Sequence, residues 1–193
     1  KIMAAKRPTV ADIRASKGKR QYTMLRTETM EELEAAEKAG IDMVSVPPAM
    51  MLRKDFRDAA PTLFAVPGDN FYEIGATDDF IRWAFPLIKA SADAIYCSAS
   101  LTTIRRLAEE NIPVIGHTGL IPSRATWTGG FKAVGKTRES ADLVWNQVKA
   151  LEEAGAFGAE IEVVPSDVAA EISARTNLFL ISMVAGAGCD CQY

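Results

Sequence analysis

The chain has 193 residues, of which 48% are apolar and 24% are charged, and its formal net charge is −3. This mixture is typical of a soluble globular protein, and the length suits one barrel domain over residues 1–193. Acidic and basic residues are interspersed without a basic stripe, which argues against nucleic acid as a partner.

Short apolar runs recur along the whole chain and predict strands. They are largely apolar rather than alternating, as strands covered on both faces should be. The runs lie at residues 22–25, 42–46, 62–66, 94–97, 113–115, 157–163 and 178–184.

Amphipathic segments between these runs predict helices. Residues 30–38 end at Gly40, a typical helix stop, and residues 77–90 begin with acids that favour a helix N-terminus. Further helices are expected at 101–110 and 139–154 and from Pro165 onward. Strands that alternate with helices in this way are parallel.

Two architectures fit this alternation, an open doubly wound sheet and a (β/α)8 barrel. Seven strand–helix units without a break in composition favour the α/β barrel of the TIM type. No eighth strand is evident before Tyr193, so we expect a barrel that lacks its last strand in this chain.

The sequence gives no sign of a membrane protein or of export. No stretch reaches the length of a signal-peptide core or a membrane span. The three cysteines, Cys97, Cys189 and Cys191, lack the spacing of a disulfide framework. A cytoplasmic protein without membrane contact is expected.

In a barrel of this type the chemistry lies where the strands end. The sole histidine, His117, opens a loop that runs to Thr137, far longer than most such connections. Trp127 and Phe131 could anchor this loop, which is expected to be functional rather than disordered. The other polar, charged or loop-forming positions at strand ends are Arg26, Glu28, Pro47, Pro48, Asp69, Ser98, Glu162, Gly186 and Asp190.

Each of these candidates has a structural alternative. His117 could equally be a structural hydrogen-bonding residue. Glu160 and Glu162 fall on the same face of their strand by alternation, and an unpaired carboxylate inside a barrel is costly, so a functional Glu162 is favoured. Cys189 and Cys191 could bind a metal, but two free thiols are favoured.

Several motifs taken together resemble the ketopantoate hydroxymethyltransferase (3-methyl-2-oxobutanoate hydroxymethyltransferase) family. They are IPVIGHTGLIPSRATWTGGFKAVGKT, ALEEAGAFGAEIEVVPSDVAAEIS and VAGAGCDCQ, together with the opening TVADIRASKGKR. The resemblance implies a barrel of the phosphoenolpyruvate mutase/isocitrate lyase superfamily. It also implies a homo-oligomer that uses Mg2+ and methylenetetrahydrofolate to transfer a hydroxymethyl group to an α-keto acid in pantothenate biosynthesis.

Carried over by position, the resemblance implies that Glu162 is the general base and that His117 lines the keto-acid site. The acidic metal positions of the family are lost. At those positions this sequence has Pro47 and Pro48, the segment 65–67, and Ser98. Asp69 follows the second of them but is displaced by three residues. Tyr96 takes the place of the family's substrate lysine.

These losses predict a pocket that works without Mg2+, because that ion needs oxygen ligands of the carboxylate type. Arg26 would hold the carboxylate of a small α-keto acid, Glu162 would transfer the proton, and His117 would bond an oxygen. Tyr96 and Ser98 would contact the substrate. The enzyme would then be hydroxymethyltransferase-like or a related C–C lyase.

Two alternatives remain open at this stage. One is a non-catalytic homologue that binds a small carboxylic acid or acts as a subunit of an assembly. The other is a degenerate barrel that binds no ligand.

Overall fold

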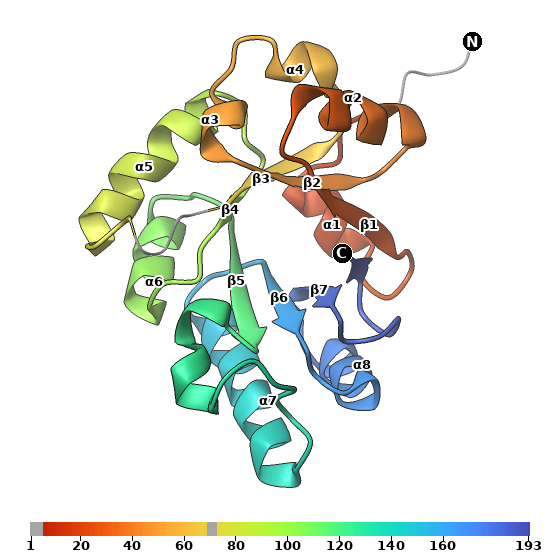
Figure 1. Cartoon of the computed structure of the whole chain (residues 1–193), viewed down its shortest axis with the longest axis vertical. Coiled ribbons are helices and arrows are strands. Elements are labelled where there is room, and N and C mark those ends of the chain that lie inside the picture. Colours follow the sequence, from red (N-terminus) through yellow and green to blue (C-terminus); the bar gives the residue numbers. More distant parts are fainter. Residues whose placement is uncertain (1–5, 69–72) are drawn as a thin grey trace.

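The fold is a nearly closed barrel of parallel strands. The computed structural model describes residues 6–68 and 73–193. Its eight strands form one sheet in the order β3-β2-β1-β8-β7-β6-β5-β4 (Figure 1). They are β1 (Tyr22–Arg26), β2 (Met43–Val46), β3 (Phe64–Pro67), β4 (Ile95–Tyr96), β5 (Val114–Gly119), β6 (Gly158–Glu162), β7 (Phe179–Met183) and β8 (Cys191–Gln192). The predicted TIM-type barrel is confirmed.

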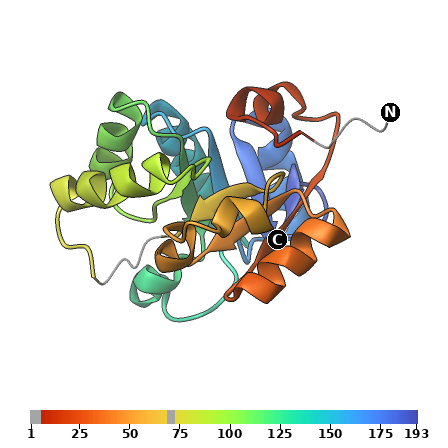
Figure 2. The ribbon, with the colours of Figure 1, turned by 90° about the horizontal axis from the view of Figure 1, so that it is seen from above.

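The helices lie outside the strands (Figures 1 and 2). Threonines that precede α1, α2 and α7 each form a capping box, and Gly40 ends α2 in the left-handed conformation, as its sequence predicts. The helices are α1 (Val10–Ala15), α2 (Met30–Ala39), α3 (Pro48–Met51), α4 (Phe56–Ala59), α5 (Thr77–Lys89), α6 (Leu101–Glu109), α7 (Arg138–Glu153) and α8 (Ser166–Arg175), with the 3-10 helix η1 (Pro122–Thr128). No helix in residues 6–68 and 73–193 is long and apolar enough to cross a membrane.

The expectation that the chain lacks its last strand is wrong. Cys191 pairs in parallel with both Ile181 of β7 and Tyr22 of β1, so this chain supplies its own eighth strand. The strand escaped prediction because it has only two residues and follows β7 without an intervening helix. The backbone N–H of Tyr22 donates to the carbonyl of Asp190 at 2.8 Å and extends the connection by one residue.

On the opposite side of the barrel, β3 and β4 meet at a seam with little hydrogen bonding. Gly68 and Tyr96 form a single isolated bridge at its upper end. At its lower end the backbone N–H of Asp93 donates to the carbonyl of Ala65 at 3.0 Å, and the N–H of Ala65 donates to Asp93 Oδ2 at 2.8 Å. Among the described residues, strand pairing is therefore continuous around the barrel except along this seam.

The strands separate two apolar cores. One lies between the sheet and the helices, and the other fills the barrel interior and includes Ile13 of α1, which closes its lower end. Along β5, Ile115 belongs to the interior core, whereas Val114 belongs to the outer one. Since side chains alternate along a strand, His117 shares the interior face with Ile115 at the upper end of the barrel.

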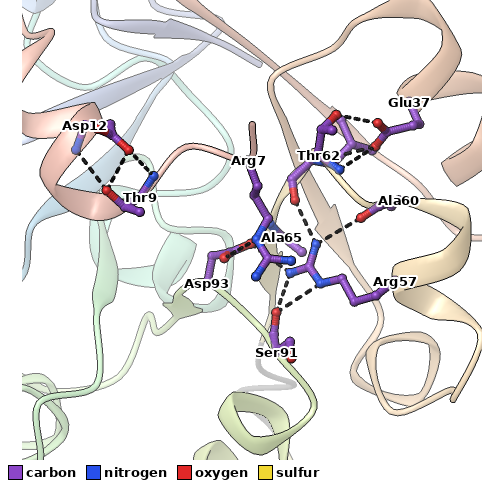
Figure 3. A network of polar contacts seen from close by, with 11 residues as sticks. Arg7, Thr9, Asp12, Glu37, Arg57, Ala60, Thr62, Ala65, Ser91 and Asp93 are labelled. Atoms are coloured by element: carbon purple, nitrogen blue, oxygen red, sulfur yellow. Dashed lines mark hydrogen bonds and ion pairs between the residues drawn. The ribbon is translucent and has the colours of Figure 1, made fainter. Parts of the chain in front are cut away.

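A polar network around Arg57 braces the lower end of the seam (Figure 3). The Arg57 guanidinium donates to Asp93 Oδ2 at 2.8 Å and to the Leu63 carbonyl at 2.9 Å, and it also bonds the Ser91 carbonyl. Arg7 contacts the other Asp93 oxygen at 3.1 Å. Burial lowers the pKa of Arg57, and the Asp93 charge opposes part of that shift. This one side chain therefore connects α4 to the segments that lead into both strands of the seam.

Replacing Arg57 with methionine is expected to lower the free energy of unfolding by about 3 kcal/mol, because it leaves buried carbonyls and the Asp93 carboxylate without their donor. Urea denaturation measures the loss. Arg53→Met is the matched control, since Arg53 and Asp55 form an exposed pair, and its effect should stay below about 1 kcal/mol. Equal denaturation midpoints for the two variants would contradict the bracing role.

Candidate active site

A cavity of about 400 Å³ lies at the upper end of the barrel, where the strands end. It is lined by all five residues for which the sequence predicted a role, namely Arg26, Tyr96, Ser98, His117 and Glu162. They come from β1, the end of β4, β5 and β6. The structure thus brings together residues up to 136 positions apart in the chain, from Arg26 to Glu162 (162 − 26).

A larger and more open groove of about 860 Å³ lies between α1 and α8. Two of its basic side chains are already paired, Lys17 with Asp190 at 2.6 Å and Arg20 with Asp42. Because those cations are neutralised and the cavity at the strand ends collects the acid–base groups, we place the candidate site at the strand ends.

The centre of the site is the His117 imidazole, which contacts three side chains. Nδ1 hydrogen-bonds the Tyr96 hydroxyl and lies 3.6 Å from Glu160 Oε2. Nε2 lies 3.0 Å from Glu162 Oε2, an ion-pair contact whose angle does not meet that of a hydrogen bond. The side chains of His117, Glu160 and Glu162 are only 3%, 8% and 14% exposed. Because these side chains are buried, their polar contacts come from one another rather than from water.

The two glutamates share the inner face of β6, as strand alternation predicts, and both line the cavity. Directly after Glu162, Val163 has a φ of 48°, and Val184, which follows β7, has a φ of 54°. Left-handed backbone is rare for β-branched residues and costs about 1–3 kcal/mol each. The Val163 N–H donates to the Met183 carbonyl at 2.9 Å, which ties the two strained ends together beside the site.

Arg26 lies at the rim of the cavity. Its Nε donates to Glu28 Oε1 at 2.6 Å, and the pair is half exposed. Within the described residues, no hydrogen bond engages either Nη atom of Arg26, so one edge of the guanidinium can take an anion. A Cβ at Gly68 would lie 3.6 Å from Tyr96 Cδ1 and 3.8 Å from Arg26 Nη1, which places Gly68 beside both side chains.

Three polar residues of the cavity, Ser45, Ser123 and Tyr193, were not predicted from the sequence. Tyr193 hydrogen-bonds Ser45, and burial raises the pKa of its hydroxyl. Its position depends on β8, which the sequence did not reveal. Ser123 Oγ is buried and has no hydrogen-bond partner among the residues described, so an oxygen of a ligand would satisfy it.

The long loop after β5 is held by its backbone and by Arg124 rather than by aromatic anchors. Arg124 Nη2 donates to the Ser98 carbonyl at 2.7 Å, and the N–H of Val134 donates to the Val163 carbonyl at 3.0 Å. The expectation that Trp127 and Phe131 anchor the loop is wrong, since they are 89% and 75% exposed.

The donor set does not fit Mg2+. Pro47 and Ser98 stand where the family resemblance implies acidic ligands, and Asp69 lies outside the described residues. Both carboxylates of the cavity contact His117, and Arg26 adds a positive charge at its rim. Nowhere in the described parts of the chain do three or more His, Cys, Asp or Glu side chains form a group that could hold a metal ion.

The cysteine pair near the end of the chain has the character of buried thiols. Cys189 and Cys191 are both buried, and burial raises the pKa of Cys189 to about 11 and also raises that of Cys191. Since metals bind the thiolate, this environment disfavours a metal site there. Neither cysteine forms a disulfide.

The chain is similar to known proteins both in sequence and in fold. A family model described as ketopantoate hydroxymethyltransferase matches residues 70–193. A 3-methyl-2-oxobutanoate hydroxymethyltransferase of Nitratidesulfovibrio vulgaris is 31% identical over 95% of this chain and 68% of its own length. Another, from Caldivirga maquilingensis, is 31% identical over 98% of this chain and 80% of its own length.

The solved structures share the fold at low sequence identity. A 2,3-dimethylmalate lyase of the PEP mutase/isocitrate lyase superfamily matches with a TM-score of 0.67 and 12% identity, over 94% of this chain and 76% of that chain. The phosphoenolpyruvate phosphomutase of Streptomyces platensis matches with a TM-score of 0.65 and 13% identity, over 91% of this chain and 72% of that one. These matches show that the chain shares the barrel fold of those proteins.

Proposed function

The chain belongs to the ketopantoate hydroxymethyltransferase family, and we propose that it makes or breaks a C–C bond next to the carbonyl of a small α-keto acid. The observation that carries the proposal is one cavity of about 400 Å³ that contains Arg26, His117 and Glu162. The relatives' name gives 3-methyl-2-oxobutanoate as the acceptor of a hydroxymethyl group, and we propose the same acid here.

The proposed roles follow from the chemistry of each group. The Nη edge of Arg26 binds the carboxylate of the acid, because guanidinium and carboxylate match in a bidentate pair. Glu162 removes the proton from the carbon next to the carbonyl, and the imidazole of His117 bonds the oxygen that becomes negative. Ser98 and Tyr96 contact the acid from the β4 side.

We propose that this chemistry proceeds without Mg2+, because the described residues at the strand ends do not form a group of ligands for it. Methylenetetrahydrofolate, the one-carbon donor implied by the family resemblance, is the donor to test. No step of the proposed proton transfer requires a resident cofactor, since Glu162 and His117 lie 3.0 Å apart and face the same cavity.

Arg26→Ala is expected to weaken binding of 3-methyl-2-oxobutanoate by about tenfold to a hundredfold, the loss of one charge-assisted pair at a half-exposed site. Isothermal titration with the acid and with ketopantoate, in EDTA and then in Mg2+, measures it. Arg53→Ala is the matched control because Arg53 also bonds an acid two residues ahead, but outside the cavity.

The outcomes separate the possible functions. Binding that is indifferent to Mg2+ and weakened only by Arg26→Ala supports the proposal. Binding only with Mg2+ would refute the metal-free part. Absence of binding to either compound would favour the non-catalytic homologue, which the loss of the whole ligand set otherwise makes the second candidate.

A further inference from the structure

Two hydroxyl groups lie beside Arg26 in the cavity. Ser45 of β2 and Tyr193, which directly follows β8, hydrogen-bond one another through their side chains, and both line the cavity. Strand β1, which carries Arg26, lies between β2 and β8 in the sheet. Arg26 and Ser45 are in register, so they are direct neighbours across the two strands.

Strand alternation places these three side chains on the interior face of the barrel. Residues two positions earlier on each strand belong to the interior core, namely Met24 on β1, Met43 on β2 and Cys191 on β8. Because side chains two residues apart point to the same face of a strand, Arg26, Ser45 and Tyr193 face the cavity together.

The number of protons in the hydroxyl pair leaves one hydrogen-bond donor unused. Each hydroxyl carries one proton and can also accept a hydrogen bond. Whichever of Ser45 and Tyr193 donates to the other, the proton of the accepting hydroxyl is left over. Within the described residues, neither hydroxyl makes a second hydrogen bond. The pair can therefore donate one hydrogen bond to a ligand.

The surroundings of Tyr193 keep its phenol protonated at neutral pH. Burial raises the pKa of the hydroxyl, and its hydrogen bond with Ser45 opposes part of that shift. The charges of Glu160 and Arg26 act on the same pKa in opposite directions. The influence of the Arg26 charge also shows that the guanidinium and the phenol are close enough to act on one ligand.

A carboxylate held by Arg26 has room for the unused donor. Its two oxygens present about four lone-pair positions, of which a bidentate guanidinium occupies about two. A hydroxyl beside the guanidinium can bond one of the others, and a hydrogen bond to a charged group is stronger than one between neutral groups.

We propose that Ser45 and Tyr193 form one binding unit that donates a single hydrogen bond to the carboxylate of the α-keto acid held by Arg26. This inference rests on the proposed function and adds two residues to the part of the cavity that binds the acid. The carboxylate is then held from β2, β1 and β8, while His117 and Glu162 act from β5 and β6.

The test is isothermal titration of the variant Ser45→Ala/Tyr193→Phe with 3-methyl-2-oxobutanoate in EDTA. The dissociation constant should rise by about tenfold to a hundredfold, as expected for loss of a hydrogen bond to a charged group. Alanine and phenylalanine remove both hydroxyls and keep the remaining shape of the side chains, so the urea midpoint should stay close to that of the wild type.

The same double change in an Arg26→Ala background tests whether all three residues bind one carboxylate. Without Arg26 the carboxylate is no longer held beside the hydroxyl pair, so loss of both hydroxyls should then raise the dissociation constant by less than about threefold. An equal rise in both backgrounds would show that the pair bonds another part of the ligand, and would overturn the proposed contact.

Ser16→Ala/Tyr22→Phe is the matched control. Ser16 and Tyr22 also form a serine–tyrosine hydroxyl pair, at 3.0 Å, but they lie outside the cavity, and this variant should bind the acid like the wild type. If Ser45→Ala/Tyr193→Phe does so as well, while Arg26→Ala weakens binding, this inference is overturned and the proposed function stands. If the wild type does not bind the acid, the proposed function fails and this inference with it.

Discussion

Replacing Glu162 with glutamine is expected to lower kcat by about a thousandfold while the α-keto acid still binds. Glutamine keeps the size and the planar end of the side chain but cannot take a proton, and loss of a general base costs about 10²–10⁴-fold in rate. The expected result is a fall in kcat with little change in KM. Formation of the hydroxymethyl product from methylenetetrahydrofolate and 3-methyl-2-oxobutanoate, followed by NMR, measures it.

Glu152→Gln is the matched control for this prediction. Glu152 is also a glutamate with hydrogen-bonded oxygens, from Thr176 at 2.9 Å and Asn177 at 2.8 Å, but it lies in α7 outside the site. Its variant should turn over at the wild-type rate. Turnover by Glu162→Gln at more than about a tenth of the wild-type rate would show that the base is another group.

Replacing Gly119 with alanine is expected to lower the free energy of unfolding by about 3 kcal/mol or more. Gly119 ends β5 with a φ of 80°, and a Cβ there would lie 2.4 Å from the Glu162 carbonyl oxygen and 2.7 Å from Val164 Cγ2. The alanine must therefore push β5 away from the end of β6, which carries Glu162. Urea denaturation measures the loss of stability.

Gly40→Ala separates backbone strain from this close approach. Gly40 has a similar φ of 75°, but nothing lies within 4 Å of the Cβ that alanine would add. This variant should lose only about 1–2 kcal/mol, the cost of left-handed backbone alone. Similar losses in the two variants would show that the strand ends of β5 and β6 can separate without cost.

Apolar runs and strand alternation predicted most of what positions the site. The run before His117 predicted a strand that ends just before that residue, whereas the structure extends β5 to Gly119 and has His117 within it. The Glu160–Ile–Glu162 alternation placed both carboxylates on one face. Both predictions rest on local geometry, because a strand repeats every two residues whatever surrounds it. The barrel followed from counting such runs.

Contacts between distant segments could not be predicted in this way. No local pattern joins Tyr96 to His117 or Ser45 to Tyr193, since each pair forms only when separate strands pack side by side. The two-residue β8 is defined by its neighbours rather than by its own composition. Trp127 and Phe131 show the opposite error, because apolar character alone does not establish that a side chain is buried.

The seam between β3 and β4 interrupts the barrel, and the residues of the candidate site lie on both sides of it. Arg26 stands on the side of β1, β2 and β3, whereas Tyr96, His117 and Glu162 stand on the side of β4, β5 and β6. A ligand that bonds both Arg26 and Tyr96 spans the gap and adds to the single bridge at Gly68. Binding of such a ligand and association of β3 with β4 are then thermodynamically linked. The free energy by which one favours the other is the same in both directions.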